Sequence, residues 1–215
     1  MFGEGFSKTA ERIILIYADL HIHTVYSSDS LIQPKTLVDQ LVAHNYIKAA
    51  AVTDHDSVRG CKAAIELASA YPDILLIPGV EITTPKGDML VLGTEQLPPK
   101  PWEPENIADY AKSIGGVSII AHPFRLYGMG EFARDVKVNA IEVLNGGSST
   151  SANNQAKELA KSMDLPGTAG SDAHQLSELF SVNCKIDSGL SLDEVLSSIR
   201  KGSISAQMTT STIRF

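Results

Sequence analysis

The chain alternates between short apolar segments and longer segments in which apolar residues recur every three or four positions. The short segments are rich in β-branched residues and are mostly continuous, which is typical of strands that are covered on both faces of a sheet. From this pattern we predict strands at residues 12–18, 48–53, 74–82, 88–93, 116–121, 140–145, 166–170 and 181–186.

The longer segments have the period and the end signals of amphipathic helices. They predict helices at residues 34–45, 57–71, 104–116, 151–163 and 191–202. The first and third of these begin with proline, which is favoured in the first helical turn. Asp56 is a good N-cap for the second helix, and Ser191 with Glu194 has the spacing of a capping box for the last. This alternation of strand and helix favours a parallel barrel or a doubly wound sheet.

One pair of predicted strands departs from the alternation. The strands at residues 74–82 and 88–93 are too close in sequence for a crossover helix. We therefore expect an antiparallel hairpin, with its turn in the segment "TPKG" at residues 84–87.

Residues that can bind metal gather at the carboxyl ends of the predicted strands. They are His21, His23, His55, His122 and His174, with Asp19, Asp54, Glu81 and Asp172. Of the six histidines, only His44 lies elsewhere, within a predicted helix. Because active sites of parallel βα folds form at the carboxyl ends of the strands, these positions predict one site to which several strands contribute.

The spacing of His21 and His23 allows both imidazoles to face one ion, because residues i and i+2 of an extended segment point the same way. A metal-binding imidazole usually donates its other N–H to a carboxylate or carbonyl, and Asp19 and Asp54 are the candidates for that role. Taken singly, each motif also fits a polar loop or an Asx turn before a helix. Their recurrence at successive strand ends predicts a metal cluster.

Length, charge and composition exclude some classes of function but do not identify the function. A length of 215 residues suits a single domain, which we expect to span residues 1–215 with an N-terminal extension at residues 1–11. The net charge of −7 argues against an extended surface for duplex nucleic acid. We find no signal peptide and no apolar stretch long enough for a membrane span. Cys61 and Cys184 are expected to be buried reduced thiols, so we expect a cytoplasmic protein.

The ordered set of motifs resembles the PHP (polymerase and histidinol phosphatase) family. The segments that carry the resemblance are "ADLHIHTVYSSDS", "AAAVTDHDSVRG", "IPGVEIT", "IIAHPFR" and "AGSDAH". The resemblance covers nearly the whole chain, and it is the order of the motifs that makes it specific. It implies an α/β fold of the distorted TIM-like (β/α)7 barrel type, with up to three metals at the carboxyl ends of the strands.

The resemblance also implies how the ligands are shared. The first metal would be held by His21, His23, Glu81 and Asp172, the second by Glu81 and His122, and the third by Asp29, His55 and His174. Family members with a complete second site usually place a histidine shortly after the hairpin strand, and this chain has none there. Glu95 is nearest to that position and is the expected replacement, unless the second site is weak or open.

Mixed imidazole and carboxylate ligands suit two or three divalent transition metals, Zn²⁺, Mn²⁺ or Fe²⁺, better than Mg²⁺ alone. We therefore expect a phosphoesterase in which the metals activate a water and neutralise the phosphoryl oxygens. Arg125 and Arg59 are the candidates for binding phosphate, because a guanidinium matches phosphate in a bidentate manner. His55 and His174 are the candidates for moving a proton.

The substrate class stays open from sequence. We expect a small phosphorylated molecule and rank a nucleotide or short oligonucleotide above histidinol phosphate, because small relatives of this type include nucleotide and RNA-end hydrolases. Two other functions compete. One is an amidohydrolase-type C–N hydrolase, which also uses an HxH motif on its first strand, and the other is a metal-binding PHP module without catalysis.

Overall fold

The computed structural model describes residues 15–210, so the N-terminal extension expected at residues 1–11 lies outside the described part. Its strands are β1 (Leu15–Ile22), β2 (Ile47–Val52), β3 (Leu75–Thr84), β4 (Gly87–Leu92), β5 (Val117–Ile120), β6 (Ala140–Asn145), β7 (Gly167–Gly170), β8 (Val182–Asp187) and β9 (Ile204–Met208). Its helices are α1 (Pro34–Ala43), α2 (Arg59–Ala68), α3 (Pro104–Ser113), α4 (Thr150–Ser162) and α5 (Leu192–Lys201), with two short 3-10 helices, η1 (Gly130–Asp135) and η2 (Leu176–Glu178).

The strands of residues 15–210 form one sheet in the order β7-β6-β5-β4-β3-β2-β1-β8-β9. The pairs β1–β2, β2–β3, β5–β6 and β6–β7 are parallel, whereas β4 is antiparallel to both of its neighbours and β8 to both of its own. Seven strands of this part of the chain therefore run in one direction, and their carboxyl ends lie at the same edge of the sheet.

The sheet curls until its two ends nearly meet. Ile22 forms an isolated parallel bridge with Ala173, just after β7. Two backbone hydrogen bonds flank this bridge, from His23 N to Ala173 O at 3.0 Å and from Asp172 N to His21 O at 2.7 Å. The end of β1 is therefore joined directly to the segment after β7, which confirms the barrel-like α/β class that the sequence predicts.

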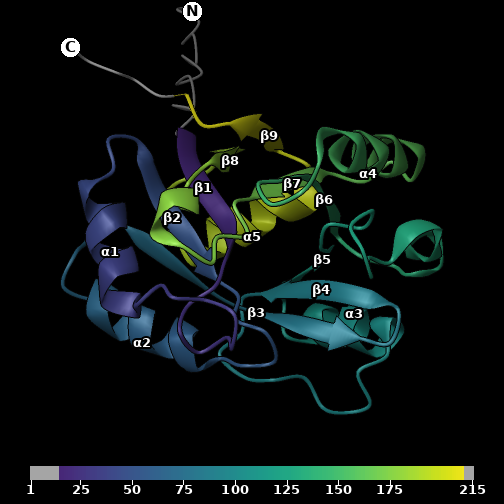
Figure 1. The fold of residues 1–215 in the computed structure, drawn as a ribbon, viewed down its shortest axis with the longest axis horizontal. Coiled ribbons are helices and arrows are strands. Elements are labelled where there is room, and N and C mark those ends of the chain that lie inside the picture. The colour runs from purple at the N-terminus through teal and green to yellow at the C-terminus, as the bar shows by residue number, and fades with distance from the viewer. Residues whose placement is uncertain (1–14, 211–215) are drawn as a thin grey trace, which may run out of the picture.

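Helices cover the barrel outside and close it at one end. Figure 1 shows α1, α2, α3 and α4 around the ring of strands, with α5 in its middle. Val195 and Ile199 of α5 are fully buried and pack with Leu20, Leu92 and Ile119 from the strands. α5 fills this part of the interior with apolar side chains. The polar residues at the carboxyl ends of the strands therefore lie at the opposite end of the barrel.

Most predicted elements are found, but some local expectations were wrong and one strand was missed. The strand predicted at residues 12–18, of which 12–14 lie outside the described part, continues through the first histidine motif to Ile22. Asp56 does not cap α2, which begins at Arg59; its carboxylate instead accepts a hydrogen bond from Thr83 N at 3.0 Å. The edge strand β9 was not predicted, since its residues are half-exposed and lack a continuous apolar run.

The hairpin and the cysteines agree with the sequence prediction. β3 and β4 pair antiparallel from Gly79 opposite Leu92 to Thr84 opposite Gly87, so the turn lies within the expected segment. Cys61 and Cys184 are both buried and free. Within residues 15–210, every helix is too short or too polar to cross a bilayer.

Candidate metal centre

The strand ends bring the predicted ligands to one place. His21 lies in β1 and His23 directly after it, Glu81 lies in β3, and His122 follows β5. The other members come from loops: Asp29 from the loop after β1, His55 from the loop after β2, and Asp172 and His174 from the loop after β7. A parallel bridge between His55 and Glu81 extends the β2–β3 pairing beyond β2 and sets these two side by side.

His21, His23, Glu81 and Asp172 form a first group, with the spacing of a metal coordination shell. His21 Nε2 lies 3.0 Å from His23 Nε2 and 3.1 Å from Glu81 Oε2. His23 Nε2 lies 3.2 Å from Glu81 Oε2 and 3.1 Å from Asp172 Oδ1. Bond lengths of about 2.0–2.2 Å to a tetrahedral ion separate neighbouring ligand atoms by roughly 3.3–3.6 Å, close to these values. All four residues are buried, so their donor atoms face one another rather than bulk water.

Glu81 is shared between this group and its neighbours. Its Oε1 lies 3.0 Å from His122 Nε2, while its Oε2 lies 3.3 Å from His55 Nδ1. The Nδ1 atom of His55 is buried and has no hydrogen-bond partner among the described residues. A carboxylate with a different imidazole at each oxygen has the geometry needed to bridge two ions.

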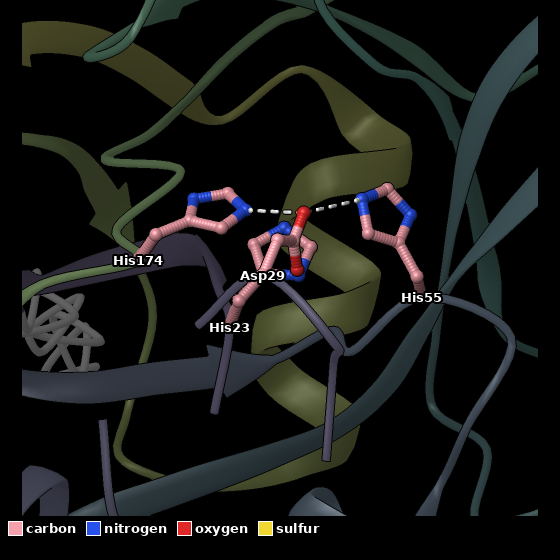
Figure 2. A group of neighbouring side chains, drawn as sticks. All are labelled: His23, Asp29, His55 and His174. Carbon is pink, nitrogen blue, oxygen red and sulfur yellow. Dashed lines mark hydrogen bonds and ion pairs between the residues drawn. The ribbon is translucent and has the colours of Figure 1, made fainter. Parts of the chain in front are cut away.

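A third group lies nearer the surface. Figure 2 shows the Asp29 carboxylate between the rings of His174 and His55, with His23 behind it. Asp29 Oδ2 lies 3.2 Å from His174 Nε2 and 3.8 Å from His55 Nε2. The four residues each offer a ligand atom within 4.8 Å of the others. The structure thus brings together all members of the three ligand sets predicted from sequence except Glu95.

Asp88, not Glu95, is the carboxylate that the hairpin adds to the cluster. Asp88, Glu81 and His55 form a further group whose ligand atoms lie within 4.8 Å of one another. Glu95 lies exposed in the loop after β4 and belongs to none of the groups. Because β4 is antiparallel, its amino end lies at the edge where the parallel strands end, and Asp88 is near that amino end.

The carboxylate that orients His21 is Glu142, which the sequence analysis did not select. Its Oε1 lies 3.0 Å from His21 Nδ1, and its Oε2 accepts a hydrogen bond from His122 N at 2.8 Å. Glu142 lies in β6 and is buried. Asn145, at the end of the same strand, donates its side-chain N–H to Glu142 at 3.0 Å and to Asp172 at 3.2 Å.

The contacts of Asp19 and Asp54 differ from those predicted. Asp19 accepts hydrogen bonds from the backbone N–H of Ser171 at 2.8 Å and of Phe180 at 3.2 Å. Asp54 accepts from Thr24, through its backbone N–H at 2.6 Å and its hydroxyl at 2.8 Å. Both carboxylates therefore fix the backbone around the cluster rather than an imidazole ring. The polar group at His23 Nδ1 is the Ser27 hydroxyl, at 3.1 Å.

Burial and the attraction between opposite charges shift the pKa values of the clustered side chains. Burial lowers the pKa of His23, but hydrogen bonds to Asp172 and Glu81 outweigh it and raise the pKa to about 9. For His21 the negative charges of Glu81 and Asp172 likewise overcome burial and raise the pKa well above its usual value. Burial raises the pKa of Glu81, but the charge of His21 and the hydrogen bond from His122 hold it well below the usual range.

The pKa values of Asp172 and Asp88 are shifted in opposite directions. The neighbouring His21 and His23 lower the pKa of Asp172 despite its burial. Burial and then the charge of Glu81 raise the pKa of Asp88. A divalent cation would neutralise the negative charge of both carboxylates, and it would replace the protons on the imidazoles.

Two of the candidate ligands have unusual backbone geometry. His122 has a φ of 25° and Asp172 a φ of 54°, both in the left-handed region that non-glycine residues rarely adopt. Such conformations cost on the order of 1–3 kcal/mol and persist where surrounding structure holds them, typically at functional sites.

The two arginines lie in different surroundings. Arg125 contacts the carboxylate of Asp172 through its guanidinium and lines a recess of about 360 Å³ beside the cluster. Arg59 is exposed at the start of α2, with its guanidinium 4.8 Å from the centre of the Tyr26 ring. Arg125 is therefore next to the candidate ligands, whereas Arg59 is held against an aromatic ring.

Comparison with protein-family models gives two matches. A model described as "PHP domain" matches residues 19–176, and a model described as "PHP-associated" matches residues 150–204. The first match contains every residue of the groups described above.

Individual relatives agree in fold and in part of the sequence. "Uncharacterized protein MJ1587" of Methanocaldococcus jannaschii is 29% identical over 140 residues, which are 60% of this chain and 81% of that protein. The "5'-3' exoribonuclease Rnm" of Salmonella typhimurium is 46% identical over 83 residues, 38% of this chain and only 27% of that protein.

A solved structure is similar over most of the chain. It is a two-domain protein of Bacteroides vulgatus described as containing a "predicted PHP-like metal-dependent phosphoesterase". The TM-score is 0.76 at 20% identity, and the similarity covers 91% of this chain and 65% of that one. At this identity the likeness establishes the fold.

Proposed function

The chain belongs to the PHP domain family, and from this membership we propose that it hydrolyses phosphate esters with two or three divalent metal ions. The observation that carries the proposal is that the Nε2 atoms of His21 and His23 lie 3.0 Å apart and 3.1–3.5 Å from carboxylate oxygens of Glu81 and Asp172. Family membership and the phosphoesterase-like fold neighbour support a metal-dependent hydrolase.

The residues present fit such ions. Imidazole nitrogens and carboxylate oxygens together are the donor set of Zn²⁺, Mn²⁺ and Fe²⁺. The first ion would be held by His21, His23, Glu81 and Asp172. The second would share Glu81 with His122, and the third would use Asp29, His55 and His174; Asp88 lies within reach of Glu81 and His55. Bound ions would lower the pKa of an attacking water and neutralise the oxygens of the phosphoryl group.

Other residues of the chain orient this shell and the substrate. Glu142 fixes the ring of His21, and Ser27 contacts that of His23. His174 and His55 are 24% and 33% exposed, so they are the histidines of the cluster with the best access to a substrate proton. Arg125 is placed to bind a phosphoryl oxygen if its guanidinium turns from Asp172 toward the recess that it lines.

The preferred substrate is a small phosphorylated molecule, with nucleotides and short oligonucleotides as the leading candidates. The exoribonuclease match supports this choice, although it covers about a quarter of that protein. The net charge of −7 disfavours a long duplex, whose binding depends on basic surface.

The double variant His21→Ala/His23→Ala tests the proposal. We expect it to lose metal-dependent release of phosphate from a monoester and to bind fewer metal equivalents by elemental analysis. The matched control is His44→Gln, which changes a histidine at the end of α1 and should keep both properties. Full activity in a folded double variant, judged by circular dichroism, would contradict the proposal.

A further inference from the structure

The cluster is flanked by two recesses with different walls. One has a volume of about 360 Å³ and is reached from Asp172 and His174. The other has a volume of about 800 Å³ and is reached from His55 and Asp88. A substrate whose phosphate lies at the cluster therefore has two directions in which its remaining part can extend.

The larger recess has an aromatic rim. Tyr127 and Phe132 line it, and their side chains are 86% and 59% exposed. The ammonium of Lys86, from the β3–β4 turn, lies 4.7 Å from the centre of the Phe132 ring. Large exposed aromatic side chains lose the free energy that burial would give them, so two of them on one rim with a cation point to a ligand.

The position of Tyr127 is held at a conformational cost. Its φ is 66°, in the left-handed region that bulky residues avoid. A tight turn fixes it there, with Gly128 N donating to Arg125 O at 2.9 Å and Gly130 N donating to Pro123 O at 2.7 Å. The segment from His122 to Gly130 thus links a candidate metal ligand to the aromatic rim through a few residues.

The smaller recess offers no comparable surface. Besides members of the cluster, its lining residues are Arg125, Gly146, Gly147, Ser171, Ser177, Glu178 and Ser181. They can bind polar groups, but none presents an aromatic face. An aromatic part of a substrate would therefore go to the larger recess.

We infer that the larger recess binds the base of a nucleotide, by stacking on Tyr127 and Phe132, while its phosphate lies at the metal cluster. This inference rests on the proposed function and specifies its substrate class. Stacking on aromatic side chains tolerates any base, because every base has a π-face. Lys86 complements the negative charge of the ligand. The same chemistry belongs to a free mononucleotide and to the end of a short strand.

The test compares two phosphate esters that differ only in the base, AMP and ribose 5-phosphate. The metal-loaded protein should have a kcat/KM for AMP about tenfold or more above that for ribose 5-phosphate. In Tyr127→Ala/Phe132→Ala this ratio should fall toward one. Leu126→Ala is the control, because Leu126 is 83% exposed beside Tyr127 but does not line the recess, and it should keep the wild-type ratio.

A second readout separates this inference from the proposed function. Isothermal titration of the metal-loaded protein measures binding of AMP and ribose 5-phosphate even if neither is hydrolysed. A preference for AMP that the double variant loses supports the base site even without turnover. Equal affinity of the wild-type protein for AMP and ribose 5-phosphate would overturn the inference. A preference for AMP that persists in the double variant would also overturn it. Repeating the measurement with a short oligonucleotide distinguishes a strand end from a free nucleotide.

Discussion

At the scale of single residues, the site depends on a buried carboxylate outside the ligand set. Glu142 contacts the ring of His21 and the backbone of His122, so it fixes two candidate ligands, one in β1 and one just after β5. A carboxylate on the far nitrogen of a ligating imidazole sets its tautomer and raises its basicity.

Glu142→Gln should weaken metal binding about 10- to 100-fold, because a neutral amide replaces the charged acceptor at His21 Nδ1. The affinity can be measured by titration of the metal-free protein with Zn²⁺ against a chelator of known affinity. Glu158→Gln, on the exposed face of α4, is the control and should bind as the wild type does. Unchanged affinity in Glu142→Gln would show that this contact does not act on the metal.

The pKa of His23 gives the metal-free protein a defined pH dependence. A pKa raised from 6.5 to about 9 corresponds to about 3 kcal/mol of stability. Because the folded state binds the proton more tightly than the unfolded state, this stability is present below pH 6.5 and is lost as the pH rises toward about 9.

Urea unfolding of the chelator-treated protein between pH 6.5 and pH 9 measures this loss. His23→Gln, which cannot gain the proton, should show a smaller decline over the same range. Equal slopes for the two proteins would mean that His23 does not carry the effect.

The site residues found from sequence stand in recognisable motifs, whereas those that were missed do not. The histidines and Asp172 stand in short polar motifs after apolar runs, so the position of each strand end places them. Glu142 is a single charge inside an apolar strand, which no periodicity distinguishes. Asp88 was missed in favour of Glu95 because it lies near the amino end of an antiparallel strand, and only the pairing of the hairpin brings it to the site.

At the scale of elements, the closure of the barrel is what assembles the first ligand group. β7 approaches β1 so closely that a Cβ added at Gly170 would clash with His21 Cβ and lie 2.8 Å from His21 N. The sequence predicted both strands but not this contact, because the local pattern of neither strand encodes their distance. Glycine is required here for close approach rather than for a turn.

Gly170→Ala should therefore destabilise the fold by roughly 1–3 kcal/mol and also weaken metal binding, since the methyl group displaces His21. Urea unfolding and metal titration give the two quantities. Gly115→Ala provides the comparison: its Cβ would meet nothing within 4 Å, but its φ is 69°. It should cost about 1–2 kcal/mol of conformational strain and leave metal affinity as it is. Wild-type metal affinity in Gly170→Ala would contradict the argument from closure.

At the scale of the whole molecule, the two ends of the barrel have separate roles. α5 and the strands fill one end with apolar side chains, and the carboxyl ends of the parallel strands carry the charged cluster at the other. The strand–helix alternation is enough to predict this division, because parallel βα folds place their sites at that edge. We propose that this cluster is a metal centre for phosphate-ester hydrolysis.

The most direct test is a metal add-back assay. The protein is stripped with a chelator, supplied separately with Zn²⁺, Mn²⁺, Fe²⁺ or Mg²⁺, and assayed for phosphate release from sugar phosphates, histidinol phosphate, mononucleotides and short oligonucleotides. We expect no release from the stripped protein and restored release with at least one transition metal. No release with any metal, from protein that elemental analysis shows to hold two or three ions, would contradict the proposed phosphate-ester hydrolysis.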